Sequence, residues 1–140
     1  DIPDPHSPYD GFFWSHMGWL FDSSSNALLF DTTNCKDLKK DDYYVWLKKN
    51  YLNITLAQPL VYLLLGGLPG LVWGFALRTV FSWHVTWAVN SVSHMWGRQM
   101  FKTGDISMNN PVVGILALGE GWHNNHHAFE DSCRHGLKWW

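Results

Sequence analysis

The stretch YLNITLAQPLVYLLLGGLPGLVWGFALRTVFSWHVTWAVNSVSHMW, residues 51–96, decides the fold class. Arg78 is its only Lys, Arg, Asp or Glu, and its length is about twice the ~20 apolar residues that cross a bilayer as one helix. The sequence GGLPG at residues 66–70 is a strong turn signal near its middle. The stretch therefore predicts one transmembrane helical hairpin in an all-α membrane protein.

Basic residues flank both ends of this stretch, whereas the predicted turn has no charge. By the positive-inside rule, both flanks are expected on the cytoplasmic side. The chain is thus divided into a cytoplasmic or interfacial segment (1–50), the membrane hairpin (51–96) and a cytoplasmic metal-binding segment (97–140). The alternative is the buried helical core of a soluble protein, which a mean hydropathy of −0.16 favours. A stretch this long with one charge is hard to bury in so small a domain.

Composition narrows the class of protein further. A net charge of −2 argues against a nucleic-acid partner. The ten tryptophans suit a membrane interface or an apolar channel. The two cysteines, Cys35 and Cys133, form neither a disulfide framework nor a metal motif. The chain opens without methionine or an apolar signal segment, so it is expected to be part of a longer protein.

The sharpest chemical signal is HNNHH at residues 123–127. On a helix or tight turn, His123 and His126 share one face, and His127 can reach the same ion or an adjacent one. Imidazole binds iron, zinc, copper and nickel, so the spacing predicts a metal without selecting it. The alternative is a polar surface turn with incidental histidines.

A stripe at helical spacing ends on another histidine. Trp83, Trp87, Asn90 and His94 follow one another at intervals of four, three and four residues. The stripe predicts an aromatic wall with a metal ligand at its end, and Asn90 could hold a water or orient a ligand. The alternative for His94 is a core imidazole with a satisfied hydrogen bond.

Three other polar residues receive simpler interpretations. Arg78 is expected to pair with a carboxylate or a carbonyl, or to extend to the interface. His84 lies off the stripe and is interpreted as structural, and His135 as solvated.

Several motifs occur together in the order found in one family. They are Asp4-Pro5-His6, GFFWSH with GW (residues 11–19), NSVSH (90–94) and GEGWHNNHH (119–127). In this order they resemble the membrane-bound delta-9 type fatty acid desaturases. The ending AFE, RHGL and WW resembles the plant, algal and cyanobacterial branch of that family. The resemblance covers nearly the whole chain and identifies it as the carboxy-terminal part of such a protein.

The resemblance implies a di-iron centre and no catalytic side chain beyond its ligands. The implied ligands are His94, His123, His126 and His127, with Asn90 reaching iron through a water. Thr86 and Trp87 match positions that line the acyl channel, and Trp83 extends the same wall. His6 and His16 match positions outside the metal shell.

The implied activity is oxygen-dependent insertion of a cis double bond into a saturated fatty acyl chain. The implied substrate is an acyl-CoA or an acyl-lipid, and the electron donor a b-type cytochrome or a ferredoxin. The membrane of the endoplasmic reticulum is the expected location, and a chloroplast membrane the alternative.

Two departures from the family keep alternatives open. The earlier histidine boxes are missing, and four ligands cannot hold two irons, so the chain is a fragment or an inactive truncated product. DSSS at residues 22–25 stands where the animal acyl-CoA members have basic residues that meet the coenzyme, which keeps an acyl-lipid substrate open. A non-catalytic remnant, a related fatty acyl hydroxylase and a hydrolytic zinc site on residues 123–127 are the competing interpretations.

Overall fold

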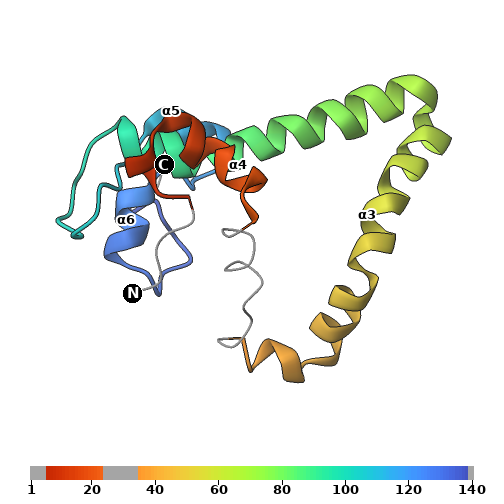
Figure 1. Cartoon of the computed structure of the whole chain (residues 1–140), viewed down its shortest axis with the longest axis horizontal. Helices are drawn as coiled ribbons and strands as arrows, with labels where there is room; N and C mark the ends of the chain where they lie inside the picture. Colours follow the sequence, from red (N-terminus) through yellow and green to blue (C-terminus); the bar gives the residue numbers. More distant parts are fainter. Residues whose placement is uncertain (1–5, 24–34, 139–140) are drawn as a thin grey trace. The chain divides into compact units, whose positions relative to one another are not determined.

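The computed structural model describes residues 6–23 and 35–138, and these residues form helices and loops without a strand (Figure 1). The motif ends Asp4-Pro5 and Trp139-Trp140 lie outside them. The elements, in chain order, are η1 (Pro8–Asp10), α1 (Phe12–His16), η2 (Gly18–Phe21), η3 (Leu38–Lys40), α3 (Asp42–Pro69), η4 (Gly70–Leu77), α4 (Arg78–Met95), α5 (Pro111–Leu116) and α6 (His123–Ala128). The predicted all-α class is therefore confirmed for the described part of the chain.

The chain divides into two compact units, and the boundary falls inside α4. The span unit is Leu29–Ser82, and the histidine unit combines Asp1–Leu28 with Trp83–Trp140. Each unit is described by itself below.

In the span unit, α3 begins at Asp42, well before the apolar stretch at residue 51. The Asp41 carboxylate accepts a hydrogen bond from the Tyr43 N–H (2.9 Å) and caps the helix. Asp42 in the first turn also suits the positive end of the helix dipole. The first arm is thus longer than the apolar pattern indicates, because capping residues lie inside the polar segment.

The predicted turn at residues 66–70 coincides with a break in the helix (Figure 1). Gly67 has φ 58° and ψ −154°, and Pro69 has no backbone N–H to donate. Beyond the break, η4 is π-helical. The Tyr62 ring packs beside Gly74, where an added Cβ would lie 2.6 Å from a ring carbon. The arms contact each other next to this bend, and a closed hairpin stays a prediction.

Arg78 forms local contacts in the span unit. Its Nε donates to the Gly74 carbonyl (3.2 Å), and its guanidinium lies 6.0 Å from the centre of the Tyr62 ring. The carbonyl partner is one of the three options predicted for this residue.

The stretch Asp42–Met95 is long and apolar enough to cross a membrane, by length and composition. None of its most apolar window is buried, and α3 has no buried side chain. Leu64, Leu65 and Trp73 are examples of its exposed apolar side chains. This surface needs an apolar environment that the described residues do not supply.

The histidine unit is held together mainly by polar side chains. The largest fully buried side chains of the described residues are Asn124, Ser15, Ser91, Ser93 and Ser107. Buried apolar side chains in the described part of the unit are Val89 and Val113. Hydrogen bonds therefore do much of the positioning in this unit.

Candidate metal centre

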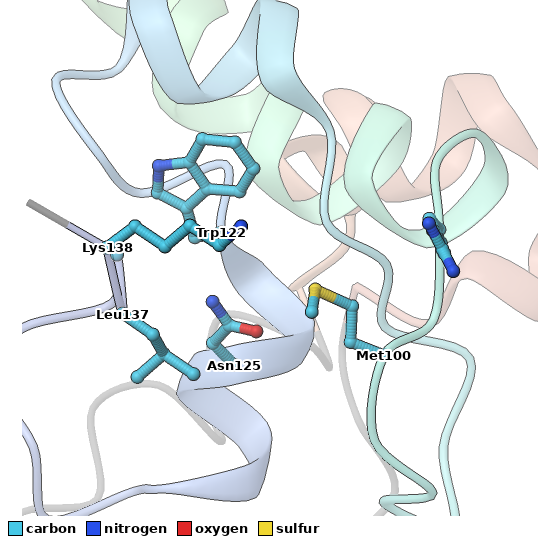
Figure 2. A pocket seen from close by; sticks show the side chains of 7 residues that line it. Met100, Trp122, Asn125, Leu137 and Lys138 are labelled. Carbon is cyan, nitrogen blue, oxygen red and sulfur yellow. The ribbon is translucent and has the colours of Figure 1, made fainter. Parts of the chain in front are cut away.

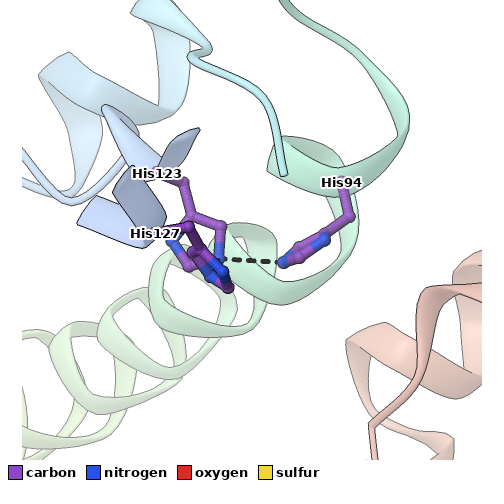
Figure 3. Close-up of side chains that lie close together, drawn as sticks. All are labelled: His94, His123 and His127. Carbon is purple, nitrogen blue, oxygen red and sulfur yellow. Dashed lines mark hydrogen bonds between the residues drawn. The ribbon is translucent and has the colours of Figure 1, made fainter. Parts of the chain in front are cut away.

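α4 and α6 bring three histidines together in the histidine unit (Figure 3). His123 Nε2 lies 2.8 Å from His94 Nε2 and 3.1 Å from His127 Nε2. Their ligand atoms all lie within 4.8 Å of one another. His123 and His127 are four residues apart on α6 and share a face, and His94 is in the last turn of α4. These three residues are called the three-histidine cluster below.

The spacing of these nitrogens fits a shared cation. Nitrogens that bind one ion at about 2.0–2.1 Å lie roughly 2.9 to 3.4 Å apart. A neutral imidazole has one N–H and one lone pair, so His123 Nε2 cannot make two full hydrogen bonds to two other ring nitrogens. A cation at the meeting point would accept all three lone pairs. The donor set therefore fits a transition metal that prefers nitrogen ligands.

Asp105 lies behind the cluster and contacts His127. Its Oδ2 is 2.8 Å from His127 Nδ1. Burial alone would raise the pKa of Asp105, but hydrogen bonds from Ser107 and Thr103, with His127 nearby, hold that pKa well below its ordinary value of 3.8. The carboxylate is thus ionised at neutral pH and can only accept a hydrogen bond.

Two histidines on α6, His123 and His126, favour their neutral, metal-binding form. Burial is the largest cause that lowers the pKa of His123 from 6.5 to about 3, and the neighbouring His94 and His127 add to it. Burial also lowers the pKa of His126, with His135 as the next cause. Neutral imidazole is the form that ligates a metal.

Asn124 fixes α6 to the loop that follows α4. Its Oδ1 accepts hydrogen bonds from Met100 N and Phe101 N, both at 2.7 Å, and its Nδ2 donates to the Phe101 carbonyl (3.0 Å). Nδ2 also lies 3.3 Å from Ser107 Oγ. The histidine spacing of the HNNHH motif assigned no role to Asn124. A polar amide between metal-ligand candidates was the available signal.

Asn125 makes a second set of contacts. Its Oδ1 accepts from Asn109 Nδ2 (2.7 Å), and its Nδ2 donates to the His135 carbonyl (2.9 Å). Asn109 Oδ1 in turn accepts from the Asn125 backbone N–H (3.2 Å). Both asparagines of the HNNHH motif therefore hold the surrounding loops against α6.

His126 is not part of the three-histidine cluster. Its ring stacks on His135 with centroids 4.4 Å apart and an interplanar angle of 25°. The interpretation of His135 as a solvated residue is therefore wrong: the residue is half-buried, and its backbone carbonyl accepts a hydrogen bond from Asn125. The sequence predicts that His123 and His126 share one helix face, whereas the observed cluster contains His123 and His127.

The predicted channel residues lie along α4. Trp83 and Trp87 stack with centroids 6.0 Å apart, whereas Thr86 is exposed. Asn90 is half-buried one turn before His94. Two rings of the stripe thus contact each other, and the aromatic wall and the roles of these four residues stay predictions.

A second histidine pair ties α1 to α4. His16 Nδ1 lies 2.8 Å from Ser91 Oγ, and His16 Nε2 lies 3.0 Å from His84 Nδ1. Ser91 Oγ donates to the Trp87 carbonyl (3.0 Å), so it accepts from His16. His84 therefore has the structural role expected of it, and the neutral His16 ring accepts from it.

A cavity of about 270 Å³ lies beside α6 (Figure 2). Trp122, Asn125 and Leu137 line it, with Arg98 and Lys138 among the other lining residues. Its volume is just below the usual range of a ligand pocket, and no histidine lines it. The cavity is therefore not assigned to the metal chemistry.

These features define a helical protein with a histidine-rich site suited to a transition metal. The sequence profile of the fatty acid desaturase family matches residues 1–140. The chain belongs to this family, which confirms the resemblance drawn from its motifs.

Relatives from plants and cyanobacteria match nearly all of the chain. It is 50% identical to the chloroplastic palmitoyl-monogalactosyldiacylglycerol delta-7 desaturase of Arabidopsis thaliana, with 98% of this chain and 37% of the relative covered. It is 46% identical to the acyl-CoA C20 Delta5-desaturase of Anemone leveillei (98% and 44%). It is 48% identical to the sn-1 stearoyl-lipid 9-desaturase of Anabaena variabilis (99% and 50%). The chain thus spans half or less of the length of these relatives.

Proposed function

We propose that the whole protein inserts a cis double bond into a saturated fatty acyl chain, in an oxygen-dependent reaction at a di-iron centre. The observation that carries the proposal is the convergence of three Nε2 atoms, from His94, His123 and His127, in a chain of the desaturase family. Bound iron would supply the oxidising power that removes hydrogen from an unactivated methylene, which no side-chain acid or base can do.

The residues of this chain would hold part of that centre. The three-histidine cluster would bind one iron through Nε2 atoms, since His123 Nε2 lies 2.8 and 3.1 Å from the other two, close to the spacing of nitrogens on one ion. His126, whose ring centroid lies 5.6 Å from that of His127 but outside the cluster, would bind the second iron, and Asn90 would reach the centre through a water. The remaining ligands would come from other histidine boxes of the whole protein.

The substrate would lie along the aromatic side of α4. Trp83 and Trp87 offer an apolar wall that ends one to two turns from Asn90 and His94, and Thr86 would border the same channel. A wall fixed relative to the ligands would select which methylene reaches the iron. Relatives named for acyl-CoA and for lipid substrates both match the chain, so the substrate is a fatty acyl group held by either carrier.

The membrane placement is part of the same proposal. The exposed apolar surface of the stretch Asp42–Met95 supports insertion as a hairpin, with both flanks on the cytoplasmic or equivalent side. The electron donor would be a b-type cytochrome in the endoplasmic reticulum or a ferredoxin in a chloroplast. One of these relatives, the delta-7 desaturase of Arabidopsis thaliana, is named as chloroplastic.

Complementation in two hosts tests the function. The full-length protein that contains this chain is expressed in yeast lacking its fatty acid desaturase, and in a cyanobacterium lacking its stearoyl-lipid desaturase. New unsaturated fatty acids in either host are expected, and the host that responds identifies the carrier and the donor. Absence of new double bonds in both hosts, with the protein present in the membrane, would refute the proposal.

Iron content tests the assignment of His126. In the full-length protein, His126→Ala is expected to lower bound iron, because it removes a ligand of one of the two ions. Lys138→Ala, at an exposed residue outside the cluster, is the control. Iron content unchanged by His126→Ala would show that this histidine is not a ligand.

A further inference from the structure

We propose that Asp105 is a positioning residue that keeps His127 in the tautomer whose Nε2 is free to bind a metal. The proposal deepens the proposed function, because it concerns the same metal centre. It rests on the contacts of both carboxylate oxygens of Asp105 and on the direction of each hydrogen bond.

One oxygen determines where the proton of His127 lies. Asp105 Oδ2 is 2.8 Å from His127 Nδ1, and an ionised carboxylate can only accept. The proton of neutral His127 must therefore be on Nδ1. Its Nε2, which faces His123 at 3.1 Å, then presents a lone pair toward the cluster.

The other oxygen prevents Asp105 from turning. Its Oδ1 accepts a hydrogen bond from the Thr103 hydroxyl (2.9 Å) and another from the Ser107 backbone N–H (2.8 Å). Both partners are donors in these contacts, so a group at this position must present an acceptor to them. Oδ2 is thereby directed at His127.

The loop that carries Asp105 is itself attached to α6. Asn124 Nδ2 lies 3.4 Å from Thr103 Oγ1 and 3.3 Å from Ser107 Oγ, and both Asn124 and Ser107 are fully buried. Since Asn124 lies between two residues of the three-histidine cluster, the carboxylate and the ring it orients belong to one hydrogen-bonded network. Motion of the loop would therefore move the cluster as well.

This geometry predicts that Asp105→Asn changes the tautomer of His127 and weakens metal binding. The amide oxygen must face Thr103 and Ser107, so the NH2 group faces His127 Nδ1. His127 Nδ1 must then accept, which moves the ring proton to Nε2 and blocks the metal. Asp105→Ala leaves the tautomer free to change, although it removes both loop contacts. The Asn variant is therefore expected to bind metal more weakly than the Ala variant.

If Asp105 were only a structural residue, the Asn variant would bind metal more tightly than the Ala variant. Asn preserves the contacts to Thr103 and Ser107, so Asp105→Asn should keep more of the fold's stability than Asp105→Ala. Stability and metal affinity thus rank the two variants in opposite directions only if Asp105 sets the tautomer.

The test is a titration of the 140-residue chain with Co²⁺ in detergent, followed by the visible absorption of the bound ion. Thermal midpoints are measured on the same samples. Asp131→Asn, an exposed carboxylate in the same unit, is the charge-matched control, and Asp105→Glu tests rescue by a carboxylate. Loss of a partner behind a metal-binding histidine typically weakens affinity 10–100-fold, and about this loss is expected for Asp105→Asn. The Glu variant should recover part of it, with the spectrum of the wild type.

The measured Co²⁺ affinities and thermal midpoints either support or overturn the role of Asp105. Weaker Co²⁺ binding by Asn than by Ala, with the thermal midpoints in the reverse order, supports the proposal. Equal affinity of Asp105→Asn and wild type, weaker binding by Ala than by Asn, or an unfolded Asn variant would overturn it. No Co²⁺ binding by the wild-type chain would also overturn it, whereas the desaturase proposal would still be judged separately by the two complementation hosts.

Discussion

Replacing Asn124 with leucine should destabilise the histidine unit by about 2–4 kcal/mol. Leucine has nearly the same size, so the cost comes from lost hydrogen bonds rather than from a cavity. The N–H groups of Met100 and Phe101 and the Phe101 carbonyl all lose a partner. A buried group left without a partner costs about 1–3 kcal/mol. Both loop residues are partly accessible, so water replaces some of these bonds and the total lies below the full sum.

Denaturant unfolding of the chain in detergent measures this loss. Asn50→Ala is the matched control, because its side chain makes a solvent-exposed hydrogen bond to the Trp46 carbonyl (2.9 Å). A change of about 0.5 kcal/mol or less is expected there. Hydrogen exchange at Met100 and Phe101 gives a second measurement, and both amides should exchange faster in Asn124→Leu.

Two results would refute this reasoning. One is a loss below about 1 kcal/mol, which would mean that water fully replaces the Asn124 contacts. The other is unchanged exchange at Met100 and Phe101, since the Asn124 oxygen would then not be what protects these amides.

Two further predictions concern glycine and pH. Gly121→Ala should lower the free energy of unfolding by about 3 kcal/mol or more, because the added Cβ would clash with the backbone of Gly114. Gly66→Ala, where the added Cβ has nothing within 4 Å, should be neutral or slightly stabilising. Equal effects of the two substitutions in denaturant unfolding would contradict this prediction. Burial and His84 lower the pKa of His16 from 6.5, so its neutral ring contributes stability that is present above that value and lost as the pH falls below it. Between about pH 7 and about pH 5, wild type should therefore lose more unfolding free energy than His16→Gln, and parallel losses would contradict the role of His16.

The sequence was sufficient for features that depend on local pattern. The break at Gly67 follows from a glycine and a proline in an apolar helix, and the presence of three histidines on the single short helix α6 follows from the HNNHH motif. The apolar pattern does not mark the start of α3 at Asp42, because the cap residue Asp41 lies in the polar segment that precedes the apolar stretch.

The direction of each ring depended on residues far away in the chain. Spacing alone allows His123 to pair with His126 or with His127. The structure selects His127 for the cluster because Asp105 holds its ring, and His135 stacks on His126. Neither contact can be derived from the five residues of the HNNHH motif.

A usable signal nevertheless lies in the loop that precedes α5. Polar residues occupy every second position from 103 to 109, and each contacts α6: Thr103 and Ser107 reach Asn124, Asp105 reaches His127, and Asn109 reaches Asn125. Alternate residues of an extended chain point to the same side, so this pattern marks one polar face. A polar face of this kind, near a histidine motif in the sequence, can supply the hydrogen-bond acceptors that the histidine rings require. Metal-binding rings need acceptors behind them, and a short helix such as α6 cannot supply these from its own residues.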